Sequence, residues 1–159
     1  MGNQLWLLRH GEAEPHGTRP DPERRLTERG QAQSRAAGAA LAALGLTFDA
    51  VFTSPKVRAR QTAELAAQEL GAQVIPHEPL AIDFTVQEAR VLLAAAGPNG
   101  RVLVVGHNPD FAQVVADLTG ARVDFKKGGV AGVRPQGAGG ELVALLRPRE
   151  LERISASGH

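Results

Sequence analysis

Short apolar runs alternate with longer alanine-rich segments along this chain, a pattern typical of strands that alternate with helices. The runs at residues 4–8, 50–53 and 101–106 are typical of strands buried on both faces, and the last is rich in β-branched valine. Two further segments, near residues 129–134 and 141–147, flank a glycine-rich stretch and predict an antiparallel hairpin at one end of the sheet.

Four segments between these runs have helical periodicity with start and stop signals. Serine or threonine precedes three of them as a side-chain cap, and each one ends at a glycine or directly before one. The predicted helices span residues 28–44, 55–71, 86–96 and 108–120, with Thr27, Ser54 and Thr85 as caps of the first three. The order of elements predicts an α/β fold: a three-layer α/β/α sandwich with a mostly parallel central sheet that contains an antiparallel strand.

Composition fits one ordinary globular domain over residues 1–159. The chain is 43% apolar, and its 18 basic and 17 acidic residues give a formal net charge of +1. This balance argues against binding to nucleic acid or to a membrane surface through bulk charge. The chain has no cysteine, and its N-terminus has no basic leader or long apolar run. We therefore expect a cytoplasmic protein without disulfides or thiolate chemistry.

Polar residues gather where the three predicted parallel strands end. Arg9-His10 follows the first strand, Thr53-Ser54 the second and His107-Asn108 the third. The carboxyl ends of strands meet at one edge of an open α/β sheet, and helix N-termini there favour anions. Arg58, in the first turn of the following helix, can reach back to the same crevice with a bidentate guanidinium. A fixed cation beside a nucleophilic imidazole indicates chemistry on a phosphoryl group.

Three blocks in this order resemble the signature of the histidine phosphatase superfamily, which includes phosphoglycerate mutases and acid phosphatases. They are Arg9-His10-Gly11, Ser54-Pro55-x-x-Arg58-Ala59-x-Gln61-Thr62-Ala63 and Gly106-His107-Asn108-Pro109. The length and the block Asp21-Pro22-Glu23-Arg24-Arg25-Leu26-Thr27 are similar to the short SixA-type phosphohistidine phosphatase branch, although Arg25 stands where that branch usually has proline.

The resemblance implies a phosphoglycerate mutase-like fold and a set of roles. His10 would be the nucleophile that takes the phosphoryl group, and Arg9, Arg58 and His107 would bind its oxygens. Arg24 is a further candidate for substrate binding. Members of the family work without metal, and we expect no cofactor or metal here, in keeping with a sequence that has no close-spaced histidine or carboxylate cluster.

A general acid is the part of the site that the sequence does not identify. Many members of the superfamily supply a carboxylic acid between the second and third blocks, where this chain offers Glu78, Asp83 and Glu88. Asp83 is the best of these candidates. Imidazole, with a pKa of about 6.5, leaves far more easily than an alkoxide. An enzyme without a strong general acid is therefore better matched to a phosphohistidine substrate. The short chain, without a cap insertion, favours a phosphohistidine-bearing signalling or phosphotransfer protein as the partner.

Two alternatives remain open. A small phosphorylated molecule could be the substrate of a phosphomonoesterase, or less readily a mutase, built on the same site. A phosphoprotein-binding module with negligible turnover would keep the pocket, although loss of His10 is the simplest route to such a module. Single residues also have structural interpretations: Ser54 as a helix cap instead of a nucleophile, and Arg24 and Arg25 as a solvated pair.

Overall fold

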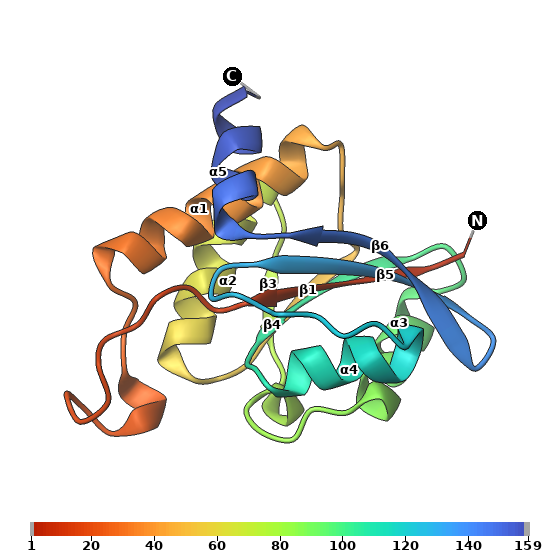
Figure 1. Ribbon diagram of the computed structural model, residues 1–159, viewed down its shortest axis with the longest axis horizontal. Coiled ribbons are helices and arrows are strands. Elements are labelled where there is room, and N and C mark those ends of the chain that lie inside the picture. The colour runs from red at the N-terminus through yellow and green to blue at the C-terminus, as the bar shows by residue number, and fades with distance from the viewer. Residues whose placement is uncertain (1, 158–159) are drawn as a thin grey trace.

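The computed structural model describes residues 2–157, which form one six-stranded sheet covered by helices on both faces (Figure 1). The strands are β1 (Gln4–Arg9), β2 (Ala50–Thr53), β3 (Val74–Pro76), β4 (Arg101–Gly106), β5 (Val130–Gln136) and β6 (Gly139–Leu146), in the order β3-β2-β4-β1-β5-β6. Neighbouring strands from β3 to β1 are parallel, and β5 is antiparallel to both β1 and β6. The predicted α/β/α sandwich with one antiparallel strand is confirmed.

Five helices within residues 2–157 form the outer layers, and two short 3-10 turns precede the first and the third of them. The helices are α1 (Glu28–Ala43), α2 (Val57–Leu70), α3 (Val86–Ala96), α4 (Asp110–Thr119) and α5 (Pro148–Ser157); the turns are η1 (Asp21–Glu23) and η2 (Glu78–Leu80). Figure 1 shows α1 and α5 on one side of the sheet and α3 and α4 on the other.

The alternation of side chains along β1 divides the core between the two faces. Leu5 and Leu7 pack into a cluster with residues of α3 and α4, whereas Trp6 and Leu8 pack into a second cluster with residues of α1, α2 and α5. All four are buried, as expected for a strand covered on both faces. The central strands that end at the polar residues are therefore fixed by packing from above and below.

Close backbone contacts between helices and loops explain two of the glycines. A Cβ atom added to Gly38 of α1 would lie 2.3 Å from the carbonyl oxygen of Ala66 in α2. A Cβ on Gly11, directly after the Arg9-His10 pair, would lie 2.6 Å from the carbonyl oxygen of Gly30 in α1. Gly11 thus allows the start of α1 to pack closely against the backbone that follows His10.

The helix caps agree with the sequence in part. Thr27 accepts a hydrogen bond from the backbone N–H of Gly30, and Thr85 accepts one from Glu88, as predicted. The prediction for Ser54 is wrong: α2 begins at Val57, and the Ser54 hydroxyl lies before the helix. β3, a three-residue edge strand that ends in proline, and α5 were not predicted from the sequence.

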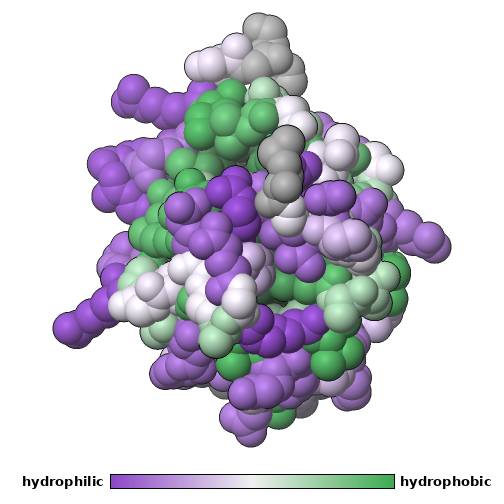
Figure 2. Space-filling model, turned by 90° about the vertical axis from the view of Figure 1, so that its right-hand side faces the viewer, coloured by the Kyte–Doolittle hydropathy of each residue, from purple (hydrophilic) through white to green (hydrophobic). Residues whose placement is uncertain are grey.

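The side of the molecule opposite the carboxyl ends of the parallel strands is mainly hydrophilic, with apolar side chains in small groups (Figure 2). Among the helices of residues 2–157, none combines the length and the apolar character needed to cross a membrane.

Candidate active site

The sheet register brings the ends of β1, β4 and β2 side by side. Arg9 pairs with Gly106 across β1 and β4, and Thr53 pairs with Val105 across β2 and β4. The backbone N–H of His10 then donates to the carbonyl of Gly106 at 3.0 Å, which puts His10 next to His107 at the sheet edge. Their ring centroids are 5.2 Å apart. The predicted convergence of these strand ends is confirmed.

His10 is buried and its imidazole has a defined tautomer. Its Nδ1 lies 2.8 Å from the carbonyl oxygen of Gly11, and because a carbonyl can only accept, Nδ1 carries the proton of this hydrogen bond. Burial lowers the pKa of His10 to about 3, with Arg58 and Arg9 acting in the same direction, although the hydrogen bond to Gly11 opposes the shift. At neutral pH the ring is uncharged, and Nε2 has a free lone pair.

His107 and Ser54 form a hydrogen-bonded pair that is not evident from the sequence. The Nε2 atom of His107 lies 2.8 Å from Oγ of Ser54, and both side chains are buried. The Nδ1 atom of His107 is buried and has no hydrogen-bond partner among the described residues. Burial, and then the neighbouring His10, lowers the pKa of His107 to about 3.

Two arginines with strong structural anchors line the pocket. Arg9 donates from Nη1 to the carbonyl of Phe125 at 2.7 Å, and its Nε is buried without a partner within residues 2–157. Arg58, in the first turn of α2, donates to the backbone carbonyl of Asp21 at 2.8 Å and to Oδ2 of its carboxylate at 3.2 Å. Both guanidinium groups reach the crevice, as predicted.

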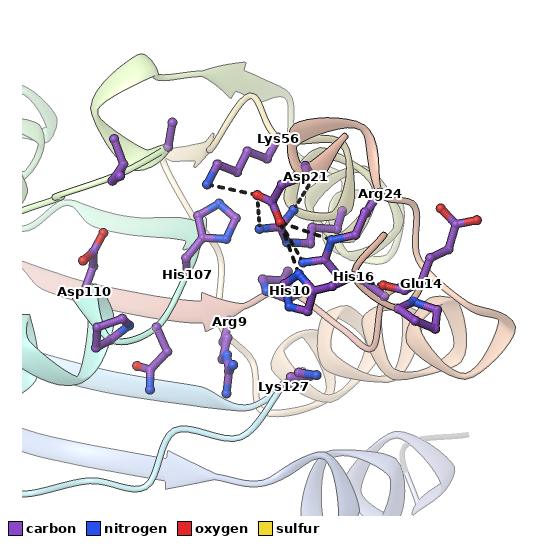
Figure 3. Close-up of a pocket in the computed structure, with 17 residues that line it drawn as sticks. Arg9, His10, Glu14, His16, Asp21, Arg24, Lys56, His107, Asp110 and Lys127 are labelled. Atoms are coloured by element: carbon purple, nitrogen blue, oxygen red, sulfur yellow. Dashed lines mark hydrogen bonds and ion pairs between the residues drawn. The ribbon is translucent and has the colours of Figure 1, made fainter. Parts of the chain in front are cut away.

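Asp21 holds the basic side chains together (Figure 3). Its carboxylate contacts Arg58, Arg24 at 3.0 Å and Lys56 at 3.6 Å. Burial works against its ionisation, but the hydrogen bond from Arg24 and the charge of Arg58 outweigh burial and lower the pKa of Asp21 to about 2. The pocket therefore contains an anion of its own that is paired with the cations, as a bound phosphoryl group would be.

Arg24 and Arg25 have different environments, so they are not the solvated pair that remained an alternative. Arg24 is buried, lines the pocket, and also donates to the carbonyl of Glu14 at 2.6 Å. Arg25 is exposed and lies outside this pocket. The structure thus brings Arg24 into the same cluster as Arg9 and Arg58.

Asp83 does not lie in the pocket. Ala81 and Ile82 line it, but the next residue, Asp83, is exposed and has a left-handed backbone with φ 58°. The carboxylates that do line the pocket are Glu14, Asp21 and Asp110. Asp110 is the first residue of α4 and directly follows the third signature block, Gly106-His107-Asn108-Pro109. Its position next to that block could have identified it as a pocket residue from the sequence.

The pocket has a volume of about 340 Å³ and is rich in positive charge. Its basic side chains are those of Arg9, Arg24, Arg58, Lys56 and Lys127, around the two neutral histidines. The positions of Lys56 and Lys127 were not predicted. Within residues 2–157 there is no group of three or more histidine, aspartate or glutamate side chains arranged to hold a metal ion. The arrangement suits a compact, multiply charged anion.

Comparisons of the sequence and of the structure each find a similar protein that covers 93% of this chain. An uncharacterized protein of Picosynechococcus sp. is 35% identical over 93% of this chain and 98% of its own length. A 2,3-bisphosphoglycerate-dependent phosphoglycerate mutase of Methylobacterium radiotolerans is 44% identical, over 48% of this chain and 37% of the mutase. The structure of the protein histidine phosphatase SixA complexed with tungstate superimposes with a TM-score of 0.83, at 26% identity, over 93% of this chain and 99% of that one.

The sequence profile of the histidine phosphatase superfamily (branch 1) matches residues 5–84, which contain the first two signature blocks and the loop with Asp21 and Arg24. The third block, with His107, lies beyond the match, and the sheet register brings it to the other two. The profile match, the full-length relative and the shared architecture agree with one another, and they support phosphatase chemistry. This chain belongs to the histidine phosphatase superfamily.

Proposed function

We propose that this protein is a metal-independent phosphatase that takes a phosphoryl group onto Nε2 of His10 and then releases it to water. The observation that carries the proposal is the tautomer of His10. The Gly11 carbonyl holds the proton on Nδ1, and the low pKa keeps the ring neutral, so a nucleophilic lone pair faces a pocket lined with cations.

The surrounding groups suit the charge of a transferring phosphoryl group. The guanidinium groups of Arg9 and Arg58 are charged, directional donors, and we assign to them and to His107 the binding of the phosphoryl oxygens. Arg24 belongs to the same proposal as a binding residue, because it is buried in the pocket wall and oriented by Asp21. A phosphate on these cations would displace Asp21 as their partner, or share them with it.

The proposed reaction has two steps. Nε2 of His10 attacks phosphorus, and the bond from phosphorus to the leaving atom breaks as that atom takes up a proton from solvent. A water molecule then attacks phosphorus of the phosphorylated His10 and gives up a proton to solvent, the P–N bond breaks, inorganic phosphate is released and the neutral imidazole is regenerated. The arginines stabilise the charge on the phosphoryl oxygens in both steps.

The substrate that we propose is phosphohistidine on a protein. Hydrogen bonds from Arg25 and Arg19 lower the pKa of Glu14, and the pKa of Asp21 is about 2, so both carboxylates are anions at neutral pH and hold no proton for a leaving group. An imidazole leaving group needs little help from an acid. The similarity to a protein histidine phosphatase over nearly its whole length supports the same substrate class, and we include a cytoplasmic partner protein in this proposal.

Asp110 favours a second candidate, a phosphomonoesterase that acts on small molecules. Its carboxylate lines the pocket, and Oδ2 accepts the backbone N–H of Phe84 at 3.2 Å, which orients the group. An oriented carboxyl group is what protonation of an alkoxide requires. The local similarity to phosphoglycerate mutases is consistent with this alternative.

The leaving-group dependence of kcat/KM distinguishes the two candidates. We would compare a phosphohistidine protein, aryl phosphates and alkyl phosphates in the wild type, in Asp110→Asn and in Asp83→Asn as the matched control. Asparagine tolerates the left-handed backbone of Asp83, so the control should retain wild-type rates. For a phosphohistidine phosphatase, Asp110→Asn leaves turnover of the phosphohistidine protein within about threefold and alkyl phosphates are poor substrates. If kcat/KM does not vary with the pKa of the leaving group in the wild type but falls steeply with it in Asp110→Asn, the phosphomonoesterase is established instead, since general acid catalysis contributes about 10²–10⁴-fold.

A further inference from the structure

Ser54 contacts two residues that line the pocket, and both contacts are made by its hydroxyl. The side chain is fully buried at the end of β2. Its Oγ accepts the backbone N–H of Lys56 at 3.2 Å and lies 2.8 Å from Nε2 of His107. A backbone N–H can only donate, so the one acceptor available for the hydroxyl proton in these contacts is Nε2 of His107.

The two tautomers of neutral His107 differ in how well they satisfy these groups. With the proton on Nε2, the ring donates to Ser54 and the serine proton is left buried without an acceptor among its contacts. With the proton on Nδ1, Ser54 donates to Nε2 and every group of the serine is paired. Each tautomer leaves one buried donor unpaired, the Ser54 hydroxyl in the first and Nδ1–H of His107 in the second. The first also leaves the Nδ1 lone pair buried without a donor, so the second leaves fewer polar groups unpaired.

The second tautomer leaves a single donor unsatisfied, and it belongs to a ring that lines the pocket. Nδ1 of His107 is buried and has no partner in the part of the chain that the structure describes. The ring lines the pocket beside His10, with 5.2 Å between ring centroids (Figure 3). A phosphoryl oxygen is an acceptor, so an Nδ1–H here complements it, whereas a bare lone pair would repel it.

We propose that Ser54 is a positioning residue that fixes the proton of His107 on Nδ1, so that this atom donates to a phosphoryl oxygen held over His10. The inference rests on the proposed function of the site, because it gives His107 a phosphoryl oxygen to bind. It assigns to the serine of the second signature block a role that is neither nucleophilic nor that of a helix cap: the hydroxyl acts through His107 and does not touch the substrate.

The first test is the protonation of His107 in the wild-type protein, measured by ¹⁵N NMR at neutral pH with His107→Gln to assign the signals. We expect the Nδ1 shift of a protonated nitrogen and the Nε2 shift of a nitrogen that accepts a hydrogen bond, both without ligand and with tungstate as a phosphate analogue. A proton on Nε2 in both states would overturn the proposal. This measurement requires neither turnover nor a folded serine variant.

The second test compares Ser54→Ala with Ser54→Thr and with Ser34→Ala. Ser34 is a fully buried serine whose hydroxyl donates to the Gly30 carbonyl within α1, so Ser34→Ala removes a similar buried hydroxyl outside the pocket. In Ser54→Ala we expect a mixture of His107 tautomers, tungstate binding weaker by about tenfold and a similar loss in kcat/KM, as for one neutral hydrogen bond. Ser54→Thr keeps the hydroxyl and should restore the tautomer.

The outcomes separate this proposal from the proposed function. If Ser54→Ala retains the wild-type tautomer and tungstate affinity within twofold, the positioning role is wrong even when His10 becomes phosphorylated. If the tautomer responds as expected but no phosphoryl group reaches His10 in the wild type, the positioning of His107 stands and the phosphatase mechanism fails.

Discussion

Arg58 is held at the pocket by two hydrogen bonds from the same guanidinium to Asp21, one to the backbone carbonyl and one to the carboxylate. Its side chain is only 7% exposed. A lysine at this position would retain the charge but not the planar fork that makes both bonds and can grip two phosphoryl oxygens. The identity of the residue, and not its charge alone, should therefore matter.

We expect Arg58→Lys to lower kcat/KM by about 10²-fold or more, comparable to the loss of a donor to an oxyanion. Steady-state kinetics of Arg58→Lys and of Arg60→Lys test this. Arg60 lies on the same helix, is exposed and pairs with Glu64, so its variant should behave like the wild type. Arg58→Lys kinetics within threefold of wild type would remove Arg58 from the proposed site.

Single-residue roles could be predicted where a strand end determines the position of the side chain. Arg9, His10 and His107 each lie at or directly after the end of a central strand, so their convergence follows from the parallel sheet. The partners of Ser54 and Asp21 could not be predicted, because His107 is 53 residues from Ser54 and Arg58 is 37 residues from Asp21. Asp83 is exposed and is not among the residues that line the pocket, although Ile82 directly before it is.

At the scale of elements, the packing of α1 on α2 supports the position of Arg58. Gly38 lets the two helices approach so closely that an added Cβ would be 2.3 Å from the carbonyl oxygen and 2.6 Å from the Cα atom of Ala66. Backbone atoms cannot yield as a flexible side chain can, so a larger residue must move one helix. Because Arg58 lies in the first turn of α2, such a movement also changes the pocket.

We expect Gly38→Ala to lower the free energy of unfolding by about 1–3 kcal/mol, the usual cost of overpacking, despite the better helix propensity of alanine. Chemical denaturation measures this change. Gly139→Ala is the matched control, since its Cβ would have an ordinary contact at 3.5 Å. If Gly38→Ala is as stable as the control or more stable, the close contact at Gly38 does not determine how closely α1 and α2 pack.

Most elements could be predicted because their apolar period and end residues agree with each other. The helix at Thr85 begins and ends as its cap and its glycine indicate. The start of α2 could not be predicted, because the Ser54 hydroxyl, which resembles a cap in sequence, bonds to Lys56 and His107 instead. β3 is too short to give a period, and it is stabilised by pairing with β2.

At the scale of the whole molecule, two neutral histidines are buried in a pocket lined with cations. The pKa values of His10 and His107 are about 3 in the folded protein, below the ordinary value of 6.5. Between these values the unfolded chain binds more protons than the folded one. The stability contributed by neutral histidines is therefore complete above about pH 6.5 and is lost as the pH falls toward 3.

We expect the free energy of unfolding to decrease from pH 7 to pH 5 with a slope approaching about 1.4 kcal/mol per pH unit for each buried histidine. This window lies above the range in which Asp21, with a pKa of about 2, is protonated. Denaturation at several pH values should give a smaller slope for His107→Gln than for the wild type. A flat wild-type profile would contradict the neutral, buried state of the two rings.

Rapid-quench trapping with a ³²P-labelled phosphohistidine protein measures whether His10 carries the phosphoryl group during turnover. The wild type should give an acid-labile, base-stable phosphoenzyme with the label on His10. His10→Ala should give none, although it still binds tungstate because Arg9 and Arg58 remain. Label on Ser54, or turnover in the wild type without any labelled enzyme, would contradict the account.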